Sequence, residues 1–394
     1  MITPVARVEH PGTEKINIAK TFGTLLKDQF AKDPHFYLFS PDETTSNRLA
    51  TVYDTQSRAW SLPVKDFDLP SAPDGHIVEL LSENTLFATL LGHLSNGEQA
   101  MMTSYEAFFS IILSQIFQQI KFYKQMDAVA WRKPWPAVNL LSTSICWRQD
   151  HNGFSHQSPA IISALLDLPG RKVNCLFPVD DSAAVAAFNF MLTSENVVNL
   201  TTFDKNDNPR WIDSYHAQFL FDNGGASIYR FASDDDPELI LTAAGDLATR
   251  EMLRAREIIK HDRPETRLRF VGLNSLAYGA IGTTTHPLSQ ATFDDYFTTH
   301  LSILASFHGY PNTLRTILTS YTNQDRLEVH GFEEIGSTTT PMEMLALNHN
   351  SRFDLAAAIA NRLGRPDLAK KYLQALDQNR AFARANGLDQ LPLD

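Results

Sequence analysis

The densest group of ionisable and polar side chains in the sequence is the segment WRQDHNGFSHQ, residues 147–157. It contains two histidines, His151 and His156, beside Asn152, and histidine is the side chain that gains or loses a proton near neutral pH. A buried loop of this composition would be costly unless its polar groups are satisfied, which favours a site for ligand binding or proton transfer. A solvated turn in which Ser155 caps the following helix is the alternative that composition leaves open.

Two other stretches carry groups that could do chemistry. SPDETTSNRL, residues 40–49, includes Ser46 and Arg48, although its spacing favours a turn with helix-cap chemistry. Glu83 stands on an apolar helix pattern, where it is either a first-turn glutamate favoured by the helix dipole or a desolvated acid with a raised pKa. Composition favours the first interpretation. The compact motifs GxGxxG, GxxxxGK[ST], HExxH, GxSxG and GDG are absent from the sequence.

The elements around these segments predict a sheet that positions them. Residues 137–144 form a buried strand pattern before the polar segment, and residues 158–168 form a helix pattern after it. Strands and helices then alternate, which indicates a mainly parallel sheet with helices on its faces and ligands at the carboxyl ends of its strands. The other strands expected here are 99–104, 173–179 and 197–203, and the other helices are 15–30, 82–94, 105–122 and 181–192.

A second alternation follows a turn-rich, acidic stretch. We therefore predict two doubly wound α/β domains with mainly parallel sheets, at residues 1–212 and 238–394, joined by a linker at 213–237. The second domain is expected to have strands at 238–245, 267–273, 302–307 and 326–332, and helices at 247–259, 353–363 and 367–383.

Composition excludes several classes of protein. The 394 residues carry 34 Lys plus Arg against 45 Asp plus Glu, a formal net charge of −11, which argues against a nucleic-acid partner. Cys146 and Cys175 are too few for a disulfide framework or a thiolate metal site, so buried thiols and no metal ligands are expected. The N-terminus lacks a signal-peptide pattern, and no stretch is long and apolar enough to span a membrane. These features predict a soluble, cytoplasmic protein with no membrane partner.

Several segments, in order along the chain, resemble the second half of the phosphoketolases. The match extends from about residue 8 to the C-terminus, and WRQDHNGFSHQ and GSTTTP are its longest and most specific parts. The resemblance implies a pyrimidine-binding domain of a thiamine-diphosphate enzyme followed by a transketolase-like C-terminal domain. The segments are PGTEK, SPDETTSNRL, LSENTLF, SYEAF, PWPAVNLL, WRQDHNGFSHQ, FPVD, AAGD, HGFEEIGSTTTPMEM and NHNSRFDL.

The reaction that the resemblance implies is cleavage of xylulose 5-phosphate or fructose 6-phosphate by inorganic phosphate, giving acetyl phosphate and an aldose phosphate. Glu83 matches the acid that hydrogen-bonds the aminopyrimidine of thiamine diphosphate, and Tyr105 matches the aromatic residue that packs on that ring. His156 matches the histidine beside the reacting carbon, where it would act as a general acid or base. His151 and Asn152 match neighbours that line the same pocket.

Ser46 and Arg48 match a phosphate-binding pair, and Lys205 aligns with a phosphate-contacting lysine. Here the neighbours of Lys205 are Asp204 and Asn206, where the family has Gly and Gln, so an exposed loop lysine is the alternative. Ile145 stands where the family usually has a histidine. The family's Asn-Gln-His-Ala-Lys-Trp is replaced at 117–122, and an arginine expected near 126–128 is missing.

The resemblance also implies that the diphosphate and Mg²⁺ are bound by a domain that this chain lacks. The first hypothesis is therefore one subunit of a split phosphoketolase, an obligate oligomer that shares thiamine diphosphate with a partner chain. The second is a non-catalytic, phosphoketolase-like protein that binds or regulates a relative, or else a truncated remnant.

Overall fold

The computed structural model describes residues 2–41 and 43–391, and their contacts divide the chain into two compact units. The first unit contains residues 1–144 and 168–218, and the second contains 145–167 and 219–394. Segment 145–167 thus packs with the second unit, although the chain on either side of it belongs to the first. The limits 1–212, 213–237 and 238–394 remain a prediction. Within 213–237 the structure has helix α6 (Ser214–Asp222), strand β11 (Ala226–Ile228) and the short 3₁₀ helix η5 (Arg230–Ala232).

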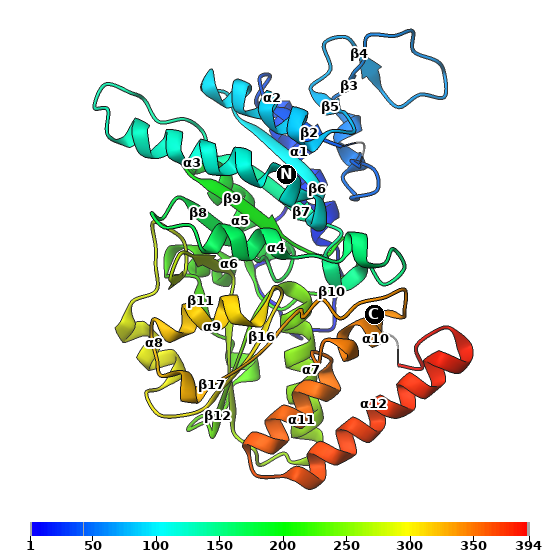
Figure 1. Cartoon of the computed structure of the whole chain (residues 1–394), viewed down its shortest axis with the longest axis vertical. Helices are drawn as coiled ribbons and strands as arrows, with labels where there is room; N and C mark the ends of the chain where they lie inside the picture. The colour runs from blue at the N-terminus through cyan, green and yellow to red at the C-terminus, as the bar shows by residue number, and fades with distance from the viewer. Residues whose placement is uncertain (1, 42, 392–394) are drawn as a thin grey trace. The chain divides into compact units, whose positions relative to one another are not determined.

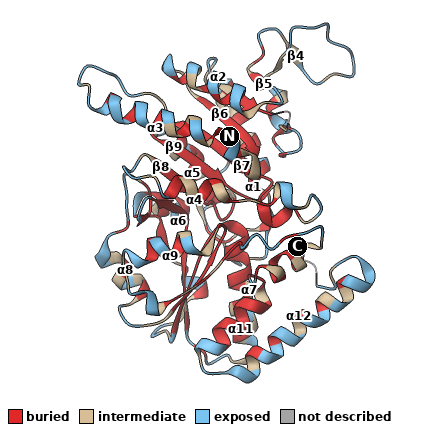
Figure 2. Ribbon diagram, viewed as in Figure 1, coloured by how far each residue is buried: buried red, intermediate tan, exposed pale blue. Residues whose placement is uncertain are grey.

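The first unit is built on a parallel sheet whose strands follow the order β8-β9-β7-β6-β2-β5-β3-β4. Its central strands are almost wholly buried (Figure 2), as expected for a sheet covered by helices on its faces. The strands are β2 (Tyr37–Ser40), β3 (Arg58–Ala59), β4 (Ser71–Ala72), β5 (Ile77–Glu79), β6 (Ala100–Tyr105), β7 (Val138–Thr143), β8 (Val173–Leu176) and β9 (Val198–Thr202), with a separate antiparallel pair, β1 (Lys15–Ile16) and β10 (Asn208–Pro209).

Three helices of the first unit, α1, α2 and α5, begin where a side chain caps a free N–H group. Asn17 accepts a hydrogen bond from the N–H of Lys20, and Asp180 accepts one from the N–H of Ala183. Helix α1 packs against α5, and α2 packs against α3. The helix expected at 105–122 is in fact a 3₁₀ turn followed by an α-helix. The helices are α1 (Ile18–Lys32), η1 (Ala50–Asp54), α2 (Glu83–Ser95), η2 (Glu106–Ile112), α3 (Leu113–Asp127) and α5 (Asp181–Thr193).

The second unit has a smaller sheet in the order β11-β13-β12-β16-β17, in which only β11 is antiparallel. The other strands are β12 (Leu239–Ala244), β13 (Leu268–Leu273), β16 (Ile303–Phe307), β17 (Leu327–His330) and the hairpin β14 (Ser275–Ala277) with β15 (Ala280–Ile281). The predicted fold class, two α/β domains with mainly parallel sheets, is confirmed.

Helix α11 of the second unit packs against both α7 and α12 (Figure 1). Ser351 and Asp354 form a capping box at its start. The helices are η3 (Cys146–Arg148), η4 (Phe154–His156), α4 (Ala160–Leu166), α7 (Asp246–Asp262), α8 (Gln290–Phe297), α9 (Pro311–Thr319), η6 (Gln324–Arg326), α10 (Pro341–Leu347), α11 (Arg352–Arg362) and α12 (Pro366–Asn386).

Two sequence-based expectations concern the whole chain. Cys146 and Cys175 are buried free thiols, as predicted, and burial raises the pKa of Cys175 above its ordinary value. Among the described residues, no helix combines the length and the apolar character needed to cross a lipid bilayer.

Candidate active site

The candidate residues of the first unit follow the carboxyl ends of neighbouring parallel strands. In the sheet register Phe39 lies opposite Met102, Tyr105 opposite Thr143, and Ser142 opposite Thr202. The loops that leave β2, β6, β7 and β9 therefore start at one edge of the sheet. This is the edge at which open α/β sheets bind ligands.

Tyr105, the last residue of β6, is the centre of a cluster of polar contacts. Its hydroxyl donates a hydrogen bond to Oγ of Ser46 at 3.2 Å, and Nζ of Lys205 lies 4.8 Å from the centre of its ring. The ring of Phe108 stacks nearly parallel to that of Tyr105, with centroids 5.9 Å apart. The structure thus brings together Ser46, Tyr105 and Lys205, and we call them, with Glu43 and Glu83, the Tyr105 cluster.

Glu43 is a member of this cluster that the sequence analysis did not single out. Its Oε2 accepts a hydrogen bond from the backbone N–H of Tyr105 at 3.2 Å. Burial, and to a lesser extent the negative charge of Glu83, raise the pKa of Glu43 to about 7, although the N–H of Tyr105 and the charge of Lys205 act in the opposite direction. A carboxyl group with this pKa exchanges its proton near neutral pH, which is what acid–base chemistry requires.

Glu83 is half-buried at the first position of α2. The preceding residue, Ser82, is the N-cap, and its hydroxyl accepts a hydrogen bond from the N–H of Thr85 at 3.4 Å. A first-turn glutamate is favoured by the helix dipole. The structure therefore shows Glu83 in the first turn of a helix, where its charge contributes to the raised pKa of Glu43, and its role at the candidate site stays a prediction.

The loop between β2 and η1 is held in place at both ends. Oγ of Ser40 accepts a hydrogen bond from the N–H of Glu43, and the buried Oδ1 of Asn47 accepts one from Oγ1 of Thr143 at 2.5 Å. Arg48, next to Asn47, has an exposed side chain and a left-handed backbone with φ of 64°. Strain of this kind in a residue other than glycine is often found at ligand sites.

The Lys205 loop is anchored independently of the Tyr105 cluster. The carbonyl of Lys205 accepts a hydrogen bond from Nδ2 of Asn17 at 3.0 Å, and buried Asp204 accepts hydrogen bonds from the backbone N–H and side-chain amide of Asn206. Asp204 and Asn206, the residues that depart from the family pattern, thus bond to each other to shape this turn.

His151, Asn152 and His156 belong to the second unit, on segment 145–167. His151 and Asn152 are exposed, and His156 is half-buried. Nδ2 of Asn152 donates to Oε1 of Gln149 at 2.7 Å, and Nδ1 of His156 lies 2.8 Å from Oγ of Ser155. These contacts fix the loop conformation and leave the exposed imidazole of His151 at the surface of its unit.

The two longest motifs of the sequence contact each other within the second unit. Nε2 of Gln157 donates hydrogen bonds to the carbonyls of Gln149 and Ser337, at 2.8 and 3.2 Å. The backbone N–H of Thr339 donates to the carbonyl of Asp150 at 2.8 Å. The GSTTTP stretch therefore supports the histidine-bearing loop. Burial raises the pKa of Asp150 in this loop above its ordinary value.

A Gly336→Ala variant is expected to unfold at lower temperature than the wild type. A Cβ on Gly336 would lie 1.9 Å from Oε1 of Gln157, so the buried Gln157 side chain would have to shift, which disturbs its hydrogen bonds to Gln149 and Ser337. We expect the free energy of unfolding, measured by urea denaturation, to fall by about 1 to 3 kcal/mol relative to the wild type. Gly92→Ala is the control because its Cβ would meet no atom within 4 Å. A Gly336→Ala variant as stable as the wild type would show that the motif contact is unimportant.

Ile145, which replaces the histidine usual in the family, is completely buried. It lies in an apolar cluster of the second unit. Nε1 of Trp147 anchors this cluster by donating to the carbonyl of His308 at 2.8 Å. In this chain the side chain of Ile145 therefore packs in an apolar core. The other buried members are Cys146, Leu247, Phe332, Met342, Met344 and Leu345.

Solved structures with the same arrangement define the fold class as transketolase-like. A transketolase from Pichia stipitis superposes with a TM-score of 0.71 and 13% sequence identity, over 91% of this chain and 47% of that one. A structure titled "Split gene transketolase, inactive beta4 tetramer" superposes with a TM-score of 0.58 and 13% identity. That match covers 89% of this chain and 99% of the other.

The chain belongs to the phosphoketolase family. Residues 20–194 match the family described as D-xylulose 5-phosphate/D-fructose 6-phosphate phosphoketolase, and residues 205–392 match its C-terminal domain. A probable phosphoketolase of Rhodopseudomonas palustris (strain HaA2) is 35% identical over 93% of this chain, and probable phosphoketolase 2 of Rhizobium meliloti is 33% identical over 96%. The chain spans about half the length of these relatives, 47% and 50%.

Proposed function

We propose that the chain forms the pyrimidine-binding and C-terminal part of a phosphoketolase that depends on thiamine diphosphate. The reaction is cleavage of xylulose 5-phosphate or fructose 6-phosphate by inorganic phosphate, which yields acetyl phosphate and an aldose phosphate. The observation that carries the proposal is the Tyr105 cluster at the carboxyl edge of the sheet, in a chain that belongs to the phosphoketolase family.

The donor set of the Tyr105 cluster fits an aminopyrimidine ring. The paired rings of Tyr105 and Phe108 offer an aromatic surface, and the carboxyl groups of Glu83 and Glu43 offer hydrogen bonds to a ring nitrogen. Glu83 would hold a proton at N1′ of the pyrimidine, and Tyr105 would pack on the ring. When bound, thiamine diphosphate supplies the nucleophilic carbon that allows a bond next to a carbonyl to break.

The remaining site residues would bind and protonate the substrates. Lys205 and Arg48 would attract phosphate groups, and the Ser46 hydroxyl would add a hydrogen bond. His156 would donate or accept a proton at the substrate hydroxyl, with His151 and Asn152 lining the same pocket. These roles rest on the match of each position to the family.

The diphosphate and Mg²⁺ would be held by a separate polypeptide. The match to nearly the whole of one chain of a split-gene transketolase supports a division of the enzyme at this point. The assembled enzyme is then an obligate oligomer in which both chains contact thiamine diphosphate.

The test is formation of acetyl phosphate from xylulose 5-phosphate, phosphate, thiamine diphosphate and Mg²⁺. We expect no product from the chain alone and steady turnover when a protein carrying the diphosphate-binding half is added. Product from the purified chain alone would contradict the partner requirement. A stable but inactive mixture would contradict the catalytic proposal.

The buried Ile145 favours a second candidate function, a non-catalytic relative that binds or regulates a complete phosphoketolase. A histidine usual in the family is absent at this position, while the core around it is fully packed. This candidate predicts that the chain changes the activity of a complete phosphoketolase without turnover of its own.

A further inference from the structure

Residues 60–70 leave the sheet of the first unit between β3 and β4 and project into solvent (Figure 1), and we call them the arm. The arm is fixed at its base, where the N–H of Trp60 donates to the carbonyl of Ala72 at 2.9 Å. It turns back at its tip, where the N–H of Lys65 donates to Oδ2 of Asp68 at 2.8 Å. The arm therefore has a defined conformation, although all its residues except Asp68 are exposed.

The arm carries apolar side chains that its own unit does not cover. Phe67, at the tip, is 82% exposed, and Leu62 is 64% exposed. Large groups of exposed apolar side chains are rare on monomeric proteins and usually mark a surface that binds a partner. The apolar residues of the arm, with exposed fractions between 38% and 82%, are Trp60, Leu62, Val64, Phe67 and Leu69.

A second exposed region of the same unit combines aromatic side chains with cations. Trp131, in the loop after α3, is 80% exposed, and Phe122, on α3, is 55% exposed. The guanidinium carbon of Arg132 lies 5.7 Å from the centre of the Trp131 ring, and Lys121 and Lys133 are exposed as well. We call these five residues the basic patch.

The cations of the basic patch are not neutralised by acidic side chains of the chain itself. Among the residues that the structure describes, Lys121, Arg132 and Lys133 form no ion pair. Asp127, the one acidic residue between Lys121 and Lys133, is already paired with Lys172. In a chain with a formal net charge of −11, such a patch attracts an acidic surface.

The arm suits the basic patch in charge and in apolar character. It carries Asp66 and Asp68 against the single Lys65, whose Nζ lies 5.6 Å from the centre of the Phe67 ring. Opposite charges favour the encounter of two surfaces, and aromatic and arginine side chains supply most of the free energy of binding at interfaces. Figure 1 shows the arm and the loop after α3 on opposite sides of the first unit, so one copy cannot lay its arm on its own basic patch.

We propose that two copies of this chain form a two-fold dimer in which the arm of each copy lies on the basic patch of the other. Phe67 packs on Trp131, and Asp66 faces Arg132 and Lys133. A two-fold axis makes the contact twice, so that each copy contributes about 20 to 30 residues, as stable interfaces require. The dimer involves neither cofactor nor turnover, so it is independent of the proposed function.

The test is the dissociation constant of the dimer, measured by sedimentation velocity of the full chain alone over a range of concentrations. We expect Phe67→Ala and Trp131→Ala each to raise this constant about 10-fold or more, since each removes a central aromatic side chain from both contacts. Added salt should also raise it, because the opposing charges are solvent-exposed.

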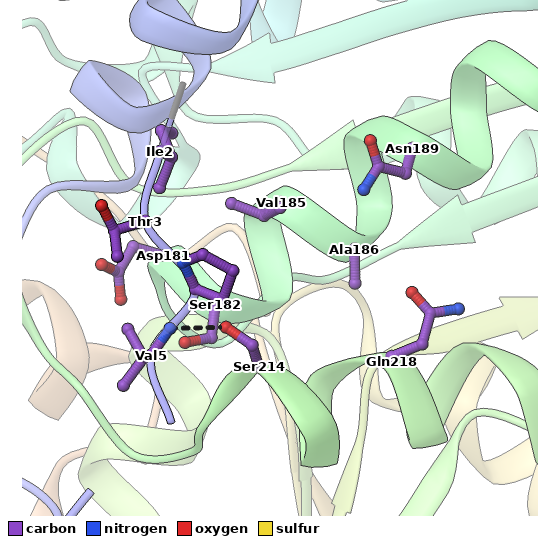
Figure 3. Close-up of a pocket in the computed structure, with 11 residues that line it drawn as sticks. Ile2, Thr3, Val5, Asp181, Ser182, Val185, Ala186, Asn189, Ser214 and Gln218 are labelled. Carbon is purple, nitrogen blue, oxygen red and sulfur yellow. Dashed lines mark hydrogen bonds between the residues drawn. The ribbon is translucent and has the colours of Figure 1, made fainter. Parts of the chain in front are cut away.

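Tyr215→Ala is the matched control and should leave the dissociation constant unchanged. Tyr215 is 82% exposed, like Phe67, and lies on α6 of the same unit. Its neighbour Ser214 is held by a hydrogen bond from the N–H of Val5 (Figure 3), so this control site belongs to neither the arm nor the basic patch. Thermal unfolding would show that each variant is folded.

A mixture of the two variants tests whether the arm contacts the basic patch. A mixed dimer of Phe67→Ala and Trp131→Ala chains has one intact arm on one intact patch, so the mixture should associate more tightly than either variant alone. Likewise, Asp66→Lys combined with Lys133→Glu should dimerise more tightly than Lys133→Glu by itself, because the exchange restores opposite charges.

Three results would overturn the proposal. The first is a chain that is monomeric at micromolar concentration, as expected if the arm instead binds the polypeptide that carries the diphosphate-binding half. The second is a dimer weakened by Phe67→Ala but not by Trp131→Ala, as expected if the two arms contact each other. The third is a mixture of the two variants that associates no more tightly than each variant alone.

Discussion

A Glu83→Gln chain, assembled with the diphosphate-binding half, is expected to form acetyl phosphate about 10² to 10⁴ times more slowly than the wild-type assembly. Glutamine keeps the size and hydrogen-bonding capacity of Glu83 but cannot hold an ionisable proton at the pyrimidine nitrogen. The substitution should lower kcat and change the KM for xylulose 5-phosphate little. The reason is that Glu83 would contact the cofactor and make no contact with the sugar phosphate.

The control for this experiment is Glu9→Gln, which removes one carboxylate from an exposed position of the same unit. Its activity should equal that of the wild type. Both assemblies should contain the two chains in the same ratio by gel filtration. If Glu83→Gln and Glu9→Gln had equal activity in a working assembly, Glu83 would not be the residue that activates the cofactor.

Glu43→Gln is expected to stabilise the isolated chain above neutral pH and to leave its stability unchanged in acid. The folded pKa of Glu43 is about 7 and its ordinary value is 4.5, so the folded state binds a proton more tightly than the unfolded state. The contribution of Glu43 to wild-type stability should therefore be highest below about pH 4.5, should fall as the pH rises through about 7, and should then level off. Glutamine, like the protonated acid, is neutral at every pH.

The measurement is urea unfolding at about pH 5 and about pH 8. At the higher pH the variant should exceed the wild type by roughly 2 kcal/mol, a figure that allows for partial solvent screening of this half-buried group. In a Glu83→Gln chain the pKa of Glu43 should fall, because one of the charges that raises it is gone. If the free energies of unfolding of Glu43→Gln and the wild type differed by the same amount at both pH values, the raised pKa of Glu43 would be contradicted.

The alternation of strand and helix patterns predicted much of the fold. The strands expected at 173–179, 197–203 and 302–307 contain β8, β9 and β16, and the helix expected at 181–192 is α5. These segments are buried on both faces or strongly capped, so local pattern and final structure agree. The expected helix at 105–122 begins instead as a 3₁₀ helix, which starts without a side-chain cap and continues into α3.

The candidate site was predicted in part. Ser46, Tyr105 and Lys205 were named from the family resemblance, and the structure brings them together. Glu43 was not named, because in SPDETTSNRL it looks like one more polar residue of a turn. Its only local signal was its position three residues after Ser40, at the end of a buried strand. The contact with Tyr105 spans 62 positions of sequence and cannot be read from local pattern.

Residues 145–167 pack with the second unit, most of which is synthesised later, and this affects folding during synthesis on the ribosome. Gln157 emerges 180 residues before Ser337, its hydrogen-bond partner. Translation adds roughly 5 to 20 residues per second, so about 10 to 40 seconds pass before the residues that contact this segment are synthesised. During that time Trp147 cannot pack into its apolar cluster. Chaperone binding during that interval would concentrate on this segment. A gene truncated after residue 218 would leave the segment permanently without its core, and the nascent chain would then be a substrate for proteolysis.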